Sequence, residues 1–323
     1  MSELSKDSQY KWRYGFFLGC VIPNRYPMIE RSIRDVFEEL GAELLDLPGA
    51  SCCPAPGVFR AFHIPTWLVL AARNIVIGEE LGVSTITGCN GCYGTLRDAW
   101  YDLEHNPEEK KKVNEYLAKV GRKYTGKYEP KHIVQGLYLD MGLDYVKDFI
   151  KYKFTDLKVG VHYGCHIVKP SDKRPWHGQY ENPQFLDELV EITGAKSIPY
   201  KDKFMCCGAG GAVRTAVKEV AADFTREKLV NMRDAGVDII VNACPFCELQ
   251  FDLGQIEVNN FYKDIIGEPF SIPVIYLTQL LGLSMGMDPN RLGLVKNHEL
   301  SGVSPFIPYD PFLEIVKDQL TGI

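Results

Sequence analysis

The chain of 323 residues is long enough for two ordinary domains, and its 46% hydrophobic and 24% charged residues are typical of a globular protein. Its net charge of −6 argues against a nucleic-acid or anionic-membrane partner, because no basic field covers the sequence. Residues 1–13 lack the apolar core of a secretory signal, and Pro273 and Gln279 interrupt the longest apolar run, 270–287. We therefore expect a cytoplasmic protein without a membrane span, whose ten cysteines serve metal or redox chemistry rather than disulfides.

The first half of the chain alternates apolar runs of strand length with segments of helical periodicity. The expected elements are a strand at 14–21, a helix at 29–40, a strand at 42–47, a helix at 67–81 and a strand at 83–87. Cysteines lie at or just beyond the end of each strand: Cys20, Cys52 and Cys53 in a rigid loop rich in proline, then Cys89 and Cys92. This order predicts a parallel α/β sheet with the cysteines at its carboxyl tips, where open sheets place their ligands.

The second half repeats this order. The expected elements are a strand at 157–163, a helix at 184–193, a strand at 197–200, a long helix at 213–234 and a strand at 237–242. Near the end of each half, residues 133–143 and 274–283 resemble each other as strand-to-helix passages. We therefore predict two tandem α/β domains, at 1–150 and 151–295, followed by a tail at 296–323 that lies on the surface or reaches a partner.

All ten cysteines fall into two sets of five in the same order. The first set is Cys20, Cys52, Cys53, Cys89 and Cys92, and the second set is Cys165, Cys206, Cys207, Cys244 and Cys247. The first set is spaced C-x(31)-C-C-x(35)-C-x-x-C, and the corresponding intervals in the second set are 40 and 36 residues. Matched order without a spare cysteine predicts one duplicated unit that binds metal.

The number and arrangement of the thiols favour an iron–sulfur cluster in each half. A structural zinc site uses four ligands, whereas each set offers five from three loops. Adjacent cysteines do not easily pair with each other, but neighbouring thiolates can bridge or cap several irons. Glycines in the loops allow close backbone approach and offer N–H donors to a cluster, and these are Gly88, Gly91, Gly208, Gly210 and Gly211. Buried or redox-active thiols without metal are the alternative.

The spacing and the surrounding sequence resemble a known family. The repeated cysteine pattern is similar to that of the cysteine-rich CCG-domain proteins, over nearly the whole chain. More narrowly, five segments resemble the B subunit of heterodisulfide reductase: CCPAPGVF at 52–59, GCNGCYGTL at 88–96, HYGCH at 162–166, ENPQFLDELVEITGAKS at 181–197 and CCGAGGAVR at 206–214.

This resemblance implies a cofactor, a reaction and partners. Each set of five cysteines would hold one noncubane 4Fe-4S cluster and act at the catalytic centre. The reaction implied is reduction of the mixed disulfide of coenzyme M and coenzyme B, in methanogenic energy metabolism. Electrons would arrive from the ferredoxin-like C subunit and the flavin-containing A subunit of an electron-bifurcating complex, fed by a hydrogenase or formate dehydrogenase module.

Alternatives remain open at this stage. The first half reads Cys-Cys-Pro where the second reads Cys-Cys-Gly, and Pro54 has no N–H to offer sulfur, so one 4Fe-4S cluster plus one zinc is an alternative cofactor set. The chain could instead be an electron-transfer subunit of another CCG-type oxidoreductase, of the lactate, glycolate, succinate or sulfur-oxidation type. A zinc-stapled scaffold without redox function is the third possibility.

Further polar residues near the cysteines are candidates for substrate binding or proton transfer. Five cations could bind an anionic substrate: Arg60, Lys169, Lys173, Arg174 and Arg214. His63, His162 and His166 could be ligands or proton donors, although the favoured interpretation is that they are neighbours of the ligands. Asn90 and Tyr93 are interpreted in the same way.

Overall fold

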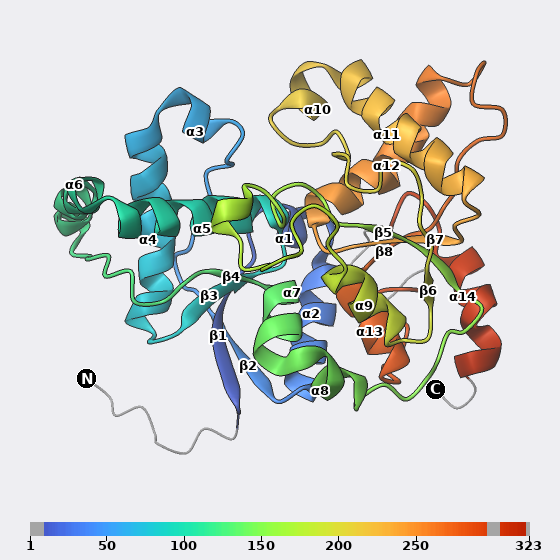
Figure 1. Cartoon of the computed structure of the whole chain (residues 1–323), viewed down its shortest axis with the longest axis horizontal. Helices are drawn as coiled ribbons and strands as arrows, with labels where there is room; N and C mark the ends of the chain where they lie inside the picture. Colours follow the sequence, from blue (N-terminus) through green and yellow to red (C-terminus); the bar gives the residue numbers. More distant parts are fainter. Residues whose placement is uncertain (1–9, 296–303, 321–323) are drawn as a thin grey trace.

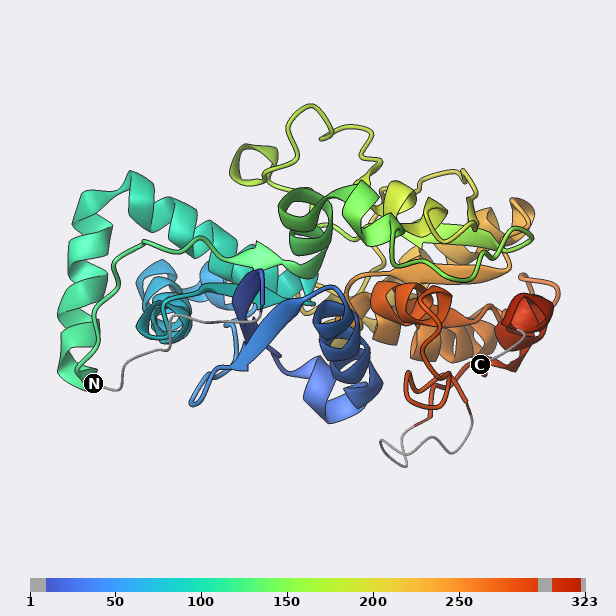
Figure 2. The same cartoon turned by 90° about the horizontal axis from the view of Figure 1, so that it is seen from below.

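The computed structural model describes residues 10–295 and 304–320 of the chain. Two four-stranded parallel sheets lie side by side along its long axis (Figures 1 and 2). The first has the order β2-β1-β3-β4 and the second β6-β5-β7-β8, so the second half repeats the topology of the first. The strands are β1 Trp12–Phe17, β2 Ala42–Asp46, β3 Ser84–Thr87, β4 Lys131–His132, β5 Lys158–His162, β6 Lys196–Ser197, β7 Ile239–Asn242 and β8 Val274–Tyr276. The predicted α/β class, with a duplicated sheet, is confirmed.

Helices flank both sheets. In the first unit these are α1 Val21–Arg25, α2 Pro27–Glu39, α3 Phe59–Phe62, α4 Ile64–Glu80, α5 Asn90–His105, α6 Pro107–Leu117, η1 Ala118–Val120, α7 Ile133–Gln135, the π-helical η2 Gly136–Gly142 and α8 Leu143–Lys147. In the second unit they are η3 Ser171–Lys173, α9 Phe185–Glu191, α10 Val213–Ala216, α11 Lys218–Asp234, α12 Pro245–Phe261, α13 Leu277–Ser284, α14 Asp310–Val316 and η4 Lys317–Leu320.

The helix predicted at 213–234 is two helices in the structure. The backbone leaves the helical region at Val217, with φ −143° and ψ 72°, which separates α10 from α11. Val217 and Val220 continue the helical spacing of apolar residues in the sequence, so the periodicity hides the break. In the structure both side chains are exposed instead of packed inward. The strand predicted at 14–21 also ends earlier, at Phe17, and a turn at Gly19 leads into α1.

The two units pack through exchanged helices. Helix α2 of the first unit packs against α13 of the second, with the Ser32 and Thr278 hydroxyls 2.7 Å apart. In the reciprocal contact, the Tyr138 hydroxyl on η2 donates to Glu188 on α9 at 2.5 Å. One buried apolar cluster therefore runs through both units and fixes their relative position.

The domain boundaries at 150 and 295 stay predictions, and residues 296–303 and 321–323 of the predicted tail lie outside the described residues. Within the part of the tail that is described, Phe312 of α14 is fully buried, and the Ile307 N–H donates to Asp252 at 2.8 Å. This part of the tail therefore packs on the second unit (Figure 1).

Candidate metal centre and substrate cavity

The cysteines of each set converge beyond the carboxyl end of their own sheet. Cys89 and Cys244 directly precede α5 and α12, so the two C-x-x-C motifs occupy the first helical turns. The Thr87 hydroxyl accepts a hydrogen bond from the Cys89 N–H at 3.4 Å, and Asn242 Oδ1 accepts one from the Cys244 N–H at 3.0 Å. The first turn of a helix also offers free N–H groups and the positive end of its dipole, which stabilise thiolates.

Within each set, neighbouring cysteine side chains lie close enough to interact. In the first set Cys53 contacts Cys52 and Cys92, and Cys92 contacts Cys89. In the second set Cys206 contacts Cys165 and Cys207, and the sulfurs of Cys207 and Cys247 are 3.5 Å apart. Hydrogen bonds donated by their neighbours lower the pKa of Cys53 to about 4 and that of Cys206 to about 2. In each set the neighbouring thiols thus favour the thiolate form of one cysteine, Cys53 in the first and Cys206 in the second.

The two sets meet at the boundary between the units. The side chains of Cys89 of the first set and Cys244 of the second lie close enough to affect each other's pKa. The loops approach equally closely, since a Cβ on Gly57 would lie 2.9 Å from the Cα of Gly211. Cross-unit hydrogen bonds hold the loops together: Asn90 donates to the Tyr163 carbonyl at 2.8 Å, and the Tyr276 hydroxyl donates to the Gly88 carbonyl. The chain thus brings all ten predicted cysteines into one continuous site.

Exposure increases from the centre of this site outward. Cys53, Cys89, Cys92, Cys207, Cys244 and Cys247 are buried, Cys165 and Cys206 are half-buried, and Cys20 and Cys52 are exposed. The six buried thiols belong to one apolar cluster that includes residues of both units. The centre of the site therefore has a low dielectric, while its outer thiols can be reached from solvent.

Two glycines that sequence reasoning left out are required by the geometry. Gly19 and Gly164 precede the first cysteine of each set and have φ of +71° and +74°. A Cβ would lie 2.7 Å from Cys92 Sγ at Gly19 and 3.4 Å from Cys247 Sγ at Gly164. The repeated Gly-Cys dipeptide was the signal in the sequence, because only glycine combines this backbone with so close an approach to sulfur.

The five glycines predicted to approach the cofactor lie in different surroundings. The Gly208 N–H donates to Cys206 Sγ at 3.3 Å, and a Cβ on Gly91 would lie 3.8 Å from Cys89 Sγ. A Cβ on Gly88 would instead collide with Ile33 and the Tyr276 hydroxyl. A Cβ on Gly210 or Gly211 would meet no atom within 4 Å. The roles of these glycines toward a cofactor stay predictions.

The Cys-Cys-Pro departure is partly compensated. Position 54 offers no N–H, but the Ala55 N–H hydrogen-bonds Cys52 in its place. The Pro54 carbonyl accepts from the Trp67 indole at 3.1 Å and from the Thr95 hydroxyl at 2.9 Å. Side chains of α4 and α5 therefore hold the first loop in place.

The three candidate histidines have different positions. His63 is exposed and caps α4 by accepting from the Thr66 N–H at 3.2 Å. His162 is fully buried, and one of its ring nitrogens lies within 4.8 Å of the sulfurs of Cys207 and Cys247. His166 lines a cavity beside Cys165, and burial followed by the charge of Arg174 lowers its pKa.

Of the five candidate cations, four are engaged by acidic side chains. Arg174 is fully buried with Asp98 at 2.7 Å, Lys173 contacts Asp102, and Arg214 binds Glu257 at 2.9 Å. Arg60 reaches Asp98 at 3.4 Å and Asp102 at 3.2 Å. Within residues 10–295 and 304–320, Lys169 has no ion pair, and it is exposed at the cavity.

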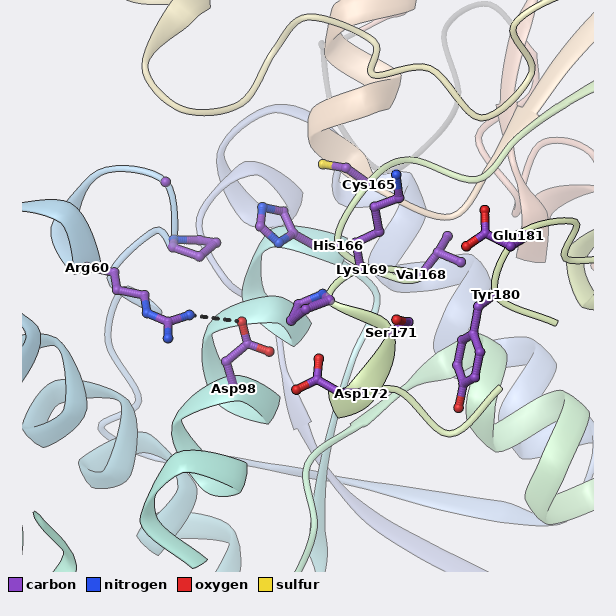
Figure 3. Close-up of a pocket in the computed structure, with 13 residues that line it drawn as sticks. Arg60, Asp98, Cys165, His166, Val168, Lys169, Ser171, Asp172, Tyr180 and Glu181 are labelled. Atoms are coloured by element: carbon purple, nitrogen blue, oxygen red, sulfur yellow. Dashed lines mark hydrogen bonds and ion pairs between the residues drawn. The ribbon is translucent and has the colours of Figure 1, made fainter. Parts of the chain in front are cut away.

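The cavity of about 520 Å³ lies between the units, beside the second set. Cys165, His166 and Lys169 reach it from one loop of the second unit, and Arg60 and Asp98 reach it from the first unit (Figure 3). Buried Arg174 fixes this loop, because it donates to the carbonyls of His166 at 2.7 Å and Lys169 at 2.8 Å. An anionic molecule in this cavity would lie next to a candidate metal ligand and an unpaired lysine.

The donor set fits an iron–sulfur cluster in each half. Thiolate is the ligand such clusters require, and five thiols per unit exceed the four of a tetrahedral zinc site. Backbone N–H groups reach the sulfurs of Cys52, Cys206 and Cys207. Hydrogen bonds of this kind stabilise the charge on cluster ligands.

Comparison with known proteins agrees with this site. The chain matches the cysteine-rich domain family CCG over residues 14–97 and again over 159–252. It is 50% identical, over 88% of its length and 93% of the other protein, to the B subunit of the ferredoxin/F(420)H(2)-dependent CoB-CoM heterodisulfide reductase of Methanosarcina acetivorans. It is 29% identical, over 88% of its length and 96% of the relative, to the 8-methylmenaquinol:fumarate reductase membrane anchor subunit of Wolinella succinogenes. A hypothetical protein from Helicobacter pylori has a similar fold, with a TM-score of 0.65 and 18% identity over 89% of this chain and 52% of that one.

The fold and the ten clustered thiols define a duplicated cysteine-rich α/β protein of the iron–sulfur type. The chain belongs to the CCG family and, within it, to the heterodisulfide reductase B subunits. It is accordingly an oxidoreductase subunit of a complex with several subunits. Among the described residues, no helix is long and apolar enough to cross a membrane.

Proposed function

We propose that this chain is the catalytic subunit of a heterodisulfide reductase and reduces the mixed disulfide of coenzyme M and coenzyme B to two thiols. The observation that carries the proposal is that the two five-thiol sets meet between the units, with Cys89 near Cys244 and the Gly57 and Gly211 loops in close approach beside a cavity. The 50% identity to a B subunit with this activity in its name supports the substrate.

Each set would hold one noncubane 4Fe-4S cluster through its five thiolates. The clusters, when bound, supply single electrons and open iron positions for sulfur. The overall reaction consumes two electrons and two protons, breaks one S–S bond and forms two S–H bonds. Electrons would come from the ferredoxin-like C subunit and the flavin-containing A subunit of the same complex, with a hydrogenase or formate dehydrogenase module behind them.

The side chains around the cavity would bind and orient the substrate. Lys169 would pair with a sulfonate, phosphate or carboxylate of the disulfide, because its ammonium is exposed there without an acidic partner in the described ranges. His166 is neutral at pH 7, since its pKa is lowered, so its ring can donate one N–H hydrogen bond but holds no additional proton. Both protons for the two product thiols would therefore come through the solvent side of the cavity.

Iron analysis of anaerobically purified full-length chain tests the cofactor. We expect about eight irons and no zinc per chain, and loss of about half of the iron in Cys53→Ser and in Cys207→Ser. About four irons and one zinc would refute two equivalent clusters.

Steady-state reduction of the coenzyme disulfide with a reduced viologen tests the substrate. In Lys169→Ala we expect KM to rise about tenfold with little change in kcat, which corresponds to losing one charge-assisted contact of about 1.4 kcal/mol. Lys201→Ala is the matched control, because the Lys201 side chain is 75% exposed and does not line the cavity. Equal KM values in the two variants would contradict the assignment of Lys169.

An electron-transfer subunit is the second candidate, favoured by the relative from Wolinella succinogenes. It predicts iron without disulfide reduction by the isolated chain. The viologen assay above separates the two functions, since only the first gives free thiols from the chain alone.

A further inference from the structure

A buried cation lies behind the second cysteine set, whereas the equivalent position behind the first set carries a neutral residue. Helices α4 and α11 are equivalent: each follows the Cys-Cys loop of its unit and each has 17 residues. At the eleventh position α4 carries Asn74 and α11 carries Lys228, and both are fully buried. The duplicated scaffold therefore places a neutral amide and an ammonium at the same point relative to the two sets.

The Lys228 ammonium lies beside the loop that leads into Cys206 and Cys207. Its Nζ donates to the carbonyls of Asp202 and Lys203, both at 3.0 Å. The groups that favour its charged form are the thiols of Cys207, Cys247 and Cys206, in that order, followed by the Asp202 carboxylate. Burial lowers the pKa of Lys228 to about 8, so the ammonium form predominates at pH 7. Tyr200 covers it with a ring centroid 5.2 Å away.

Asn74 has a purely structural set of partners. Its carbonyl oxygen accepts from the Ser51 N–H at 3.1 Å, and its amide donates to the Cys52 carbonyl at 3.1 Å. It holds the first Cys-Cys loop but adds no charge to it.

A second difference lies at the ends of the central strands. Phe17 pairs with Thr87 in the first sheet, and His162 pairs with Asn242 in the second, so Phe17 and His162 are equivalent. Neither ring nitrogen of His162 has a hydrogen-bond partner among the described residues, although the side chain is fully buried. Its ring meets Phe251 edge-on at 4.8 Å, and a ring nitrogen lies within 4.8 Å of the sulfurs of Cys207 and Cys247. A buried polar group without a partner is costly, and the available partner here is sulfur at the second set.

We propose that Lys228, assisted by His162, raises the reduction potential of the cluster at the second set above that of the cluster at the first. The inference rests on the proposed function, in which each set holds one cluster. Reduction by a one-electron donor adds one negative charge, without breaking a bond or moving a proton. A buried ammonium stabilises that charge strongly because the surroundings have a low dielectric, and an imidazole N–H stabilises it further.

The first electron delivered to the chain then resides at the second set, the set that contributes Cys165 to the cavity. Exposure to solvent opposes this order, because water around Cys20 and Cys52 of the first set stabilises added negative charge and raises the reduction potential there. A substitution at Lys228 separates the two effects, since it leaves the exposure of the first set unchanged.

The test is a potentiometric titration of the cluster-loaded full-length chain with dithionite, monitored by electron paramagnetic resonance. The wild type should show two one-electron waves. In Lys228→Met the equilibrium constant for reduction of the high-potential cluster should fall at least tenfold, which moves its wave down by about 59 mV. The wave of lower potential should stay in place. His162→Phe, which installs the residue of the first unit, should shift the same wave by less, and Lys228→Arg should restore most of the wild-type value.

Lys218→Met is the matched control, because Lys218 lies on the same helix with a 53% exposed side chain and should leave both waves unchanged. Movement of the lower wave, or of neither wave, in Lys228→Met and His162→Phe at full iron content would overturn the inference alone. Iron content below that of two clusters in the wild type would overturn the proposed function, and the inference with it.

Discussion

A buried ion pair between the units anchors the loop that carries Cys165, His166 and Lys169. Removing one partner of this pair should lower the free energy of unfolding. Arg174 has a fully buried side chain and donates to Asp98 on α5 at 2.7 Å. In Arg174→Met, Asp98 stays buried with only the longer contact to Arg60 at 3.4 Å. Breaking a buried pair by removing one partner costs about 3–5 kcal/mol, a large part of a typical stability of about 5–15 kcal/mol.

Urea unfolding under anaerobic conditions, at matched iron content, measures this loss. Arg226→Met is the control, because Arg226 forms a partly exposed pair with Asp223 at 2.7 Å on one helix, and such pairs contribute about 0–1 kcal/mol. The double variant Arg174→Met/Asp98→Leu should recover at least about 1 kcal/mol of the loss, because no unpaired carboxylate then remains buried. If Arg174→Met is no less stable than Arg226→Met, or the double variant recovers nothing, Arg174 and Asp98 do not hold the units together in this way.

Three further predictions concern one cysteine loop, one buried histidine and the metal. Gly164→Ala should lower the free energy of unfolding by about 2–4 kcal/mol, because it places a Cβ at φ +74° and against the Asn90 amide. Gly178→Ala is the control: its Cβ, at φ +78°, meets nothing within 4 Å and should cost only about 1–2 kcal/mol. Equal losses in urea unfolding would exclude the Asn90 contact as the cause. Burial lowers the pKa of His132 from 6.5 to about 4, so on acidification the unfolded state binds a proton before the folded state does. The free energy of unfolding should therefore fall by about 3 kcal/mol from pH 7 to pH 4, and by less in His132→Asn. Parallel plots of unfolding free energy against pH for the two proteins would refute this. Removal of iron by an anaerobic chelator should lower the urea midpoint of unfolding and make the six buried thiols react with a thiol reagent. Slow labelling of the iron-free chain would contradict this, because it would show that the thiol site persists without metal.

The parallel α/β class and the place of the cysteines beyond the strands were predictable because their signals are local. Apolar runs end just before Cys89 and Cys244, and the parallel topology places such ends on one edge of the sheet. The break at Val217 was not predictable, since a single extended residue leaves the apolar periodicity on both sides intact. The early end of β1 was missed for a related reason: residues 18–21 are as apolar as a strand, although Gly19 has a positive φ.

The relation between the two halves could not be derived from either half alone. The contact of Cys89 with Cys244 depends on the packing of α2 against α13, and these helices are separated by most of the chain. A residue-by-residue alignment of the two copies would have shown that Phe17 aligns with His162 and Asn74 with Lys228. Lys228 does not stand out in the sequence, because a lysine in an amphipathic helix is normally solvated, whereas His162 was a candidate through its place next to the first cysteine of its set.

Duplication and divergence act on different parts of this molecule. The features that bring the ten thiols together are kept in both copies: a glycine before the first cysteine, a C-x-x-C on a helical first turn, and a last helix that packs on the other unit. The features that set the charge around the thiols differ, at Asn74 against Lys228 and Phe17 against His162. A strictly symmetric pair of sites would have equal affinity for an electron, so a first electron would be shared between them. The asymmetric residues would remove that degeneracy within the same framework, because Lys228 donates to the carbonyls of Asp202 and Lys203 and His162 packs on Phe251. With one cluster in each set, as proposed, the duplicated framework would fix where electrons reside, and the substituted residues would decide in which order they arrive.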